Sequence, residues 1–164
     1  MIDAKLIMPF IRSVQNVFET MLQLPVTTGQ PSVKTPGEGA ADVSGIISLS
    51  GDVEGSVVLS MPTATAERAV SLFTGTDLAH THEDFADAVG ELINMISGGA
   101  KAQLGFASVS ISCPSVVIGG RHAVFAAKDV TCIQIPCESD IGTFSVNVSF
   151  RNLAALHLTK ADAA

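Results

Sequence analysis

The segment from residue 84 to residue 104 places apolar residues at the spacing of an α-helix along its whole length. About 3.6 residues make one helical turn, so the apolar residues share one face and the polar residues lie opposite. Thr81 is expected to cap the start of this helix together with Asp84, and Gly105 is expected to follow its end. The segment predicts a long amphipathic helix whose buried face comprises Phe85, Val89, Leu92, Ile93, Ile96, Ala100 and Leu104.

A β-hairpin and two further helices are predicted before this segment. Residues 43–49 and 56–61 are rich in β-forming residues and are separated by the turn-forming sequence GDVEG. One helix is expected within residues 4–24, where apolar residues again recur at helical spacing. Another should open at Pro62 and end at Gly75, because proline suits a first helical turn and glycine suits a C-cap.

Strands dominate the chain after the long helix. The expected strands are residues 107–112, 115–118, 123–126, 130–136 and 143–150, the second and third of them joined by a turn at Gly119 and Gly120. The resulting order is helix, strands, helix, helix, strands, which lacks the regular βαβ alternation of a parallel doubly wound fold. This order predicts an α+β fold in which a mostly antiparallel sheet packs with long helices.

Two stretches of the first half have counterparts in the second. Residues 12–18 resemble residues 90–96 in pattern, and the hairpin turn at residues 51–55 resembles the one at residues 140–142. Two pseudo-symmetric, degenerate halves would explain both similarities. At 164 residues the chain is expected to form one domain over residues 1–160, with residues 161–164 as a frayed tail.

Composition excludes several classes of function. Apolar residues make up 47% of the chain and charged residues 15%, which favours a compact globule over disorder. The net charge of −7, without a run of Lys or Arg, disfavours nucleic acid as a partner. No apolar stretch approaches the roughly 18 residues of a membrane span, and the first residues do not resemble a signal peptide. Cys113, Cys132 and Cys137 show no CxxC spacing, so we expect free thiols in a cytoplasmic protein.

The exposed face of the long helix carries a polar stripe. Glu91 and Asn94 are three residues apart and therefore neighbours on the helix surface. Gly98, one turn beyond Asn94, has no side chain that projects from the helix surface, as the close approach of a partner requires. Gly98 and Gly99 each cost about 1 kcal/mol in a helix relative to Ala, so an exposed face without a function would seldom keep both. By pattern alone, a solvated helix face remains the alternative. The stripe comprises Asp84, Asp87, Glu91, Asn94, Gly98 and Lys101.

The sequence ELINMISGGAK at residues 91–101 resembles the signature helix of the CheC/CheX/FliY phosphatases, whose active-site pattern is ExxN. It is most similar to CheX, in which a small residue, a glycine and a short Ala-Lys stretch follow the motif. The resemblance extends over nearly the whole chain and keeps the expected order. Its other parts are Pro9-Phe10 with the helix that follows, the GDxxG turn followed by SVVLSMP, PSVVIG at residues 114–119, and the last strand from Gly142.

The resemblance implies a chemotaxis phosphatase that hydrolyses the aspartyl phosphate of a CheY-like response-regulator receiver. In this family Asn94 would orient the attacking water, and Glu91 would pair with the active-site Lys of the receiver. Asp87, Gly98 and Lys101 would contact the receiver. Mg²⁺ is expected on the receiver, this chain is expected to bind no cofactor or metal, and it is expected to be a homodimer.

Two positions depart from the family pattern. Gly99 stands where relatives often carry a polar residue, commonly Asn. Ser13 stands where a second ExxN ending at Asn16 would need Glu, so one site per chain is expected. The alternative function is a non-catalytic module that binds receivers or associates with the flagellar switch through the same helix.

Histidines supply the other candidate site. The spacing of His80 and His82 resembles that of two metal ligands, but no Cys or further His lies near them in the sequence. His122 is expected to be exposed in a hairpin, and His157 to have a structural role. A small-molecule sensor is a third possible function, but no motif in the sequence supports it.

Overall fold

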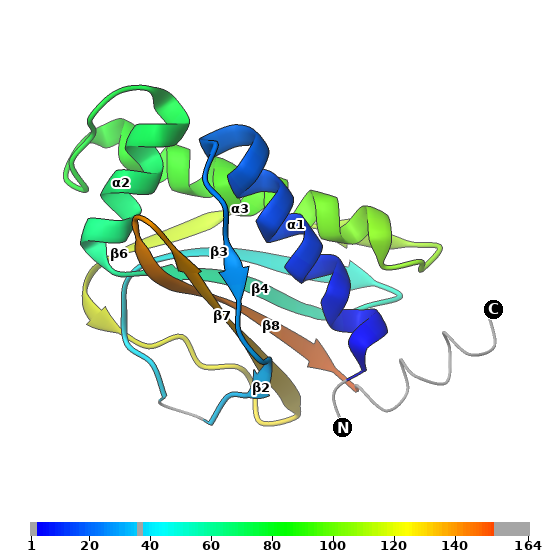
Figure 1. Cartoon of the computed structure of the whole chain (residues 1–164). Helices are drawn as coiled ribbons and strands as arrows, with labels where there is room; N and C mark the ends of the chain where they lie inside the picture. The colour runs from blue at the N-terminus through cyan, green and yellow to red at the C-terminus, as the bar shows by residue number, and fades with distance from the viewer. Residues whose placement is uncertain (1–2, 36–37, 153–164) are drawn as a thin grey trace.

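A computed structural model describes residues 3–35 and 38–152. Three helices lie on one face of an eight-stranded sheet (Figure 1). The helices are α1 (Ala4–Leu22), α2 (Thr63–Thr74) and α3 (Glu83–Gln103). The strands are β1 (Thr27–Thr28), β2 (Ser32–Val33), β3 (Ala41–Gly51), β4 (Gly55–Met61), β5 (Val109–Ile111), β6 (Ser115–His122), β7 (Val130–Ser139) and β8 (Gly142–Arg151). The predicted tail and His157 lie outside the described residues.

The sheet is antiparallel throughout, and its strand order has an approximate two-fold relation. The path runs β1-β7-β8-β4-β3-β5, with β2 also on β7 and β6 also on β3. The first half contributes α1, β1, β2, β3 and β4, and the second half contributes α3, β5, β6, β7 and β8. Each half adds two strands to the hairpin of the other half: β1 and β2 pair with β7, and β5 and β6 pair with β3. The α+β fold with two related halves is therefore confirmed, and α2 is the element without a counterpart.

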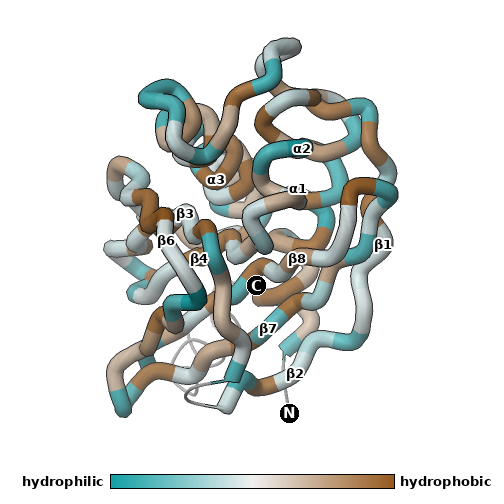
Figure 2. Tube along the Cα trace, turned by 90° about the vertical axis from the view of Figure 1, so that its left-hand side faces the viewer, coloured by the Kyte–Doolittle hydropathy of each residue, from teal (hydrophilic) through white to brown (hydrophobic). Residues whose placement is uncertain are grey.

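The core lies between the helices and the sheet. All seven residues of the predicted apolar face of α3 have no exposed surface. Beneath them, a Cβ at Gly45 of β3 would lie 3.0 Å from Cγ2 of Ile93, so the strand passes close under the helix. Apolar segments recur along α1, α3 and the strands below them, and the buried apolar residues of these elements form one core cluster (Figure 2). Burial of this apolar surface is the main force that seats α3.

The start of α3 and the course of β6 differ from prediction. His82, not Thr81, is the N-cap of α3, and its Nδ1 accepts the N–H of Asp84 at 3.1 Å. The expected turn at Gly119 and Gly120 is wrong, because β6 continues through both glycines. Pairing with β3 carries the strand on as far as the Ala41–His122 pair, across a register shift. Residues 123–126 consequently form no strand.

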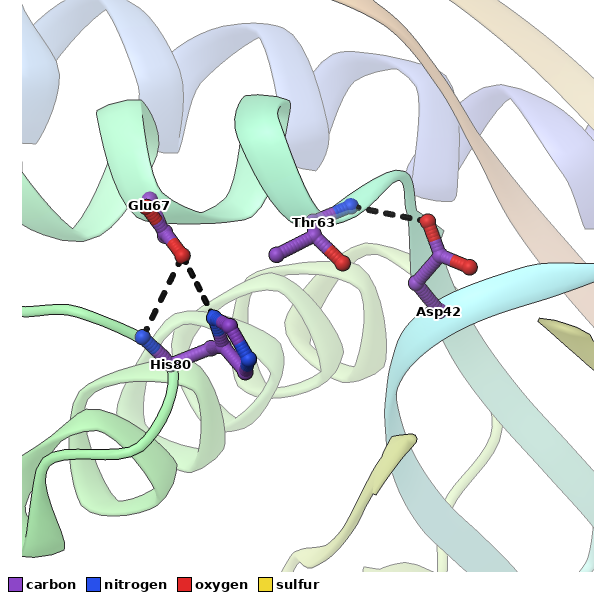
Figure 3. A network of polar contacts seen from close by, with 4 residues as sticks. All are labelled: Asp42, Thr63, Glu67 and His80. Atoms are coloured by element: carbon purple, nitrogen blue, oxygen red, sulfur yellow. Dashed lines mark hydrogen bonds and ion pairs between the residues drawn. The ribbon is translucent and has the colours of Figure 1, made fainter. Parts of the chain in front are cut away.

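Two acidic side chains hold α2 and the loop that leads into α3 (Figure 3). Asp42 accepts the N–H of Thr63 at 3.1 Å and so caps α2, whose N-cap residue is a proline that offers no side-chain hydrogen bond. This bond, together with one from the N–H of Arg121, lowers the pKa of Asp42. Glu67 of α2 lies 2.6 Å from Nδ1 of His80 and also accepts the His80 N–H at 3.3 Å. Both bonds to Glu67 lower its pKa and tie the loop to α2.

The Glu67–His80 contact should make stability depend on pH. The pKa of Glu67 in the folded protein is below its ordinary value of 4.5, so its contribution is present above that pH and is lost as the pH falls through the lowered pKa. The melting-temperature difference between wild type and Glu67→Gln should therefore shrink below about pH 4.5. Asn16→Ala, which removes an exposed side chain of α1 that does not titrate, should differ from wild type by a constant amount over the same pH range. A Glu67→Gln difference that is equal at neutral and acidic pH would contradict this role for the contact.

Candidate active site

One helix face brings all the sequence-predicted site residues together. Along the outer side of α3, Asp87, Glu91 and Lys101 are exposed, and Asn94 is half-buried between them. Gly98 lies on the same line, and a Cβ built on it would meet nothing within 4 Å. The stripe is thus an open strip of polar groups on a rigid helix whose opposite face is fully packed.

Close neighbours hold α3 on both of its sides. On one side, a Cβ at Gly90 would lie 3.2 Å from Cγ of Pro114 and 3.7 Å from Cγ2 of Val116 on β6. On the other side, a Cβ at Gly99 would lie 2.5 Å from Oγ of Ser13 on α1. Gly99 allows an approach that a Cβ would obstruct, and Gly90 allows one that a Cβ would crowd. The polar stripe points outward between these two contacts.

The two adjacent glycines have different roles. Gly99 is explained by the packing of α1 against α3, so its cost in helix propensity implies nothing about a partner. Gly98 has no such internal reason, since open space surrounds it. The interpretation that both glycines serve the exposed face is therefore wrong for Gly99, and for Gly98 it stays a prediction.

Glu91 and Asn94 have no partners of their own within residues 3–35 and 38–152. Neither side chain takes part in a hydrogen bond or an ion pair there. The Asn94 amide is thus available both to accept through its oxygen and to donate through its nitrogen. The Glu91 carboxylate is available to a cation. Together they can position polar groups of a partner.

Other chemically suggestive side chains are already engaged or buried. His80 is bonded to Glu67, His82 caps α3, and Nε2 of His122 lies 2.7 Å from Oγ of Ser44, so His122 is not the exposed hairpin residue expected. Burial raises the pKa of the Cys137 thiol to about 12, which makes it a poor nucleophile at neutral pH. The described part of the chain contains no group of three or more His, Cys, Asp or Glu placed to hold a metal ion.

The position that would complete a second motif is part of the core. Ser13 is 2% exposed and its Oγ donates to the carbonyl of Ile96 at 2.6 Å. A glutamate at this position would be buried beneath α3 and would not join the exposed Asn16 on the surface. Sequence reasoning identified Ser13 only as a missing Glu and overlooked its contact with α3. The unusual Gly99 was the available signal.

Comparison with known proteins identifies the family. The model of the family described as chemotaxis phosphatase CheX matches residues 43–138. The chain is 31% identical over 120 residues to the CheY-P phosphatase CheX of Thermotoga maritima, covering 71% of this chain and 77% of that protein. A CheC-like superfamily protein from Shewanella sp. PV-4 is 30% identical with a TM-score of 0.84, covering 92% of this chain and all of that one.

A solved CheX–CheY–BeF₃–Mg²⁺ complex from Borrelia burgdorferi has the same fold. Its matching chain is 24% identical with a TM-score of 0.75, over 93% of this chain and 100% of that one.

In the described residues, no helix is long and apolar enough to span a membrane. The family model covers more than half of the chain and the predicted ExxN helix lies within the matched segment. The chain belongs to the CheX family of chemotaxis phosphatases.

Proposed function

We propose that this phosphatase hydrolyses the aspartyl phosphate of a CheY-like receiver and that the α3 stripe is its active surface. The observation that carries the proposal is the pair Glu91 and Asn94, adjacent on a rigid helix, exposed or half-exposed, and unpartnered among the described residues. The named activity of the Thermotoga relative supports the choice of substrate.

Asn94 would orient the water that attacks phosphorus. A receiver aspartyl phosphate already has Mg²⁺ and a Lys to stabilise developing charge, so a well-placed nucleophile is what remains to be supplied. A carboxamide suits this task because its oxygen accepts a hydrogen bond from water while its nitrogen donates one to a phosphoryl oxygen. Asn94 is therefore a positioning group for water rather than a strong base.

Glu91 would anchor the helix over the phosphate. Its carboxylate, exposed one turn before Asn94, would pair with the ammonium of the receiver's active-site Lys. The open space at Gly98 would let the receiver backbone approach the helix. Asp87 and Lys101, exposed at either end of the stripe, would complete the contact surface.

Substitution of the two residues separates their roles. Asn94→Ala should lower the rate constant of dephosphorylation by about 10²-fold or more with little change in receiver affinity, because its hydrogen bonds act mainly in the transition state. Glu91→Ala should weaken both binding and turnover, since its ion pair forms in the ground state. The measurement is the loss of label from a phosphorylated receiver, with receiver affinity determined separately.

Matched controls come from α1. Asn16→Ala and Glu19→Ala remove an asparagine and a glutamate side chain from exposed positions of the first half. Both variants should keep the wild-type rate constant of dephosphorylation and the wild-type affinity for the receiver. Near-normal dephosphorylation by Asn94→Ala would refute the mechanism. If Asn94→Ala keeps its affinity for the receiver and the wild-type protein itself shows no hydrolysis, the chain is instead a non-catalytic receiver-binding or switch-associated module.

The metal requirement should belong to the receiver. The described residues hold no cluster suited to a metal ion, and neither Asn94 nor Glu91 needs one to act as proposed. Protein dialysed against a chelator should regain full activity when Mg²⁺ is supplied with the receiver, and should lose it when Mg²⁺ is withheld. Zinc, iron or manganese retained in stoichiometric amount and required for activity would contradict the proposal.

Association into a homodimer is also proposed. Strands β5 and β6 pair only with β3 among the described residues, which leaves their outer edges open. On β6, Val117 and Ile118 are 40% and 37% exposed, so apolar surface accompanies the open edge. Sedimentation should show a dimer at tens of micromolar, weakened by Val117→Glu but not by Leu72→Glu, which changes an exposed apolar residue on α2. A monomer only at that concentration would refute the dimer.

A further inference from the structure

A buried hydrogen bond joins α1 to the backbone of the active helix. Oγ of Ser13 donates to the carbonyl oxygen of Ile96 at 2.6 Å across 83 positions of sequence. Ser13 is 2% exposed and Ile96 has no exposed surface. The Ile96 carbonyl lies two residues after Asn94. The hydrogen bond therefore holds α3 about half a turn beyond the ExxN pair.

The hydrogen bond and Gly99 depend on each other. The Ser13 oxygen occupies the space that a side chain at position 99 would need, because a Cβ there would lie only 2.5 Å from it. Without a glycine at position 99, the Ser13 hydroxyl could not reach the Ile96 carbonyl unless one of the helices moved. The small hydroxyl and the missing side chain together set the distance between α1 and α3.

Apolar burial alone does not determine the rotation of α3. Hydrophobic contacts are non-directional, so the seven buried residues of α3 tolerate small rotations and shifts along the helix axis. A short hydrogen bond in a dry interior is directional and resists such shifts. Positioning catalysis is sensitive to them, because a displacement of about 1 Å can cost on the order of 10²-fold in rate.

We infer that Ser13 is a positioning residue of this phosphatase: its hydrogen bond to Ile96, admitted by Gly99, sets the rotation and height at which α3 presents Glu91 and Asn94. This inference rests on the proposed function of that pair. The first-half helix then serves the site without touching the substrate, and the departures at positions 13 and 99 form one device.

A double-mutant cycle tests this device. Ser13→Ala removes the hydrogen bond and preserves the helix spacing. Gly99→Ala retains the hydroxyl and introduces a clash. In the combined variant, the two Cβ atoms would lie at about the 3.5 Å now found between the Ser13 Cβ and the position of a Cβ at residue 99, which is ordinary van der Waals contact. The control is Ser44→Ala, which truncates another fully buried serine, on β3, that makes a 2.7 Å hydrogen bond away from α3.

The expected results concern kcat for a phosphorylated receiver, measured well below each melting temperature. Ser13→Ala should lower kcat by about 10-fold and Gly99→Ala by about 10²-fold, with smaller changes in KM. The combined variant should recover to the level of Ser13→Ala, and Ser44→Ala should retain wild-type kcat even if it melts earlier. The NMR signals of the Asn94 side-chain amide should shift in Ser13→Ala but not in Ser44→Ala.

Wild-type kcat in folded Ser13→Ala and Gly99→Ala would overturn the inference. A combined variant no better than Gly99→Ala would overturn it as well, since relief of the clash would then have no effect. Failure of the proposed function is separately recognisable, because Asn94→Ala would then dephosphorylate normally. In that event, unshifted Asn94 amide signals in Ser13→Ala, or additive changes in melting temperature across the cycle, would still refute the link between α1 and the site.

Discussion

Burial of the apolar face of α3 is the interaction on which the rest of the structure depends. Its seven fully buried side chains lie between the sheet and α1, and β3 passes beneath them at the close approach of Gly45 to Ile93. A helix with one such face packs with that face toward the sheet. The residues on its opposite side are therefore held outward. Glu91 and Asn94 owe their exposure to the packing of residues that take no part in the chemistry.

The two related halves differ in what their long helices carry. Each contributes a long helix and a hairpin, and each adds two further strands to the hairpin of the other half. The helix of the second half carries the ExxN pair on its surface. The helix of the first half lacks the glutamate, and Ser13 turns inward to the backbone of α3 instead. In the proposed mechanism, the first half supports α3 and the second half provides the active surface.

In the proposed chemistry, this chain has only to hold two side chains at fixed positions. A receiver with Mg²⁺ and a Lys already stabilises charge on the phosphoryl group, so a carboxamide and a carboxylate at fixed positions are sufficient contributions. A rigid helix is suited to this task because its side-chain spacing is set by its own backbone. The glycines at positions 90 and 99 allow its neighbours to approach the helix closely on both sides.

Local patterns in the sequence determined the amphipathic α3 with its stripe, the hairpin of β3 and β4, and the Gly75 cap with its φ of 73°. These features depend on neighbouring residues, and the motif on α3 made the family recognisable. Tertiary structure decided what non-local contacts control. Pairing with β3 carried β6 through Gly119 and Gly120, where the local signal favoured a turn. The reason for Gly99 lay in Ser13, which is distant in sequence and meets α3 only when the two helices pack.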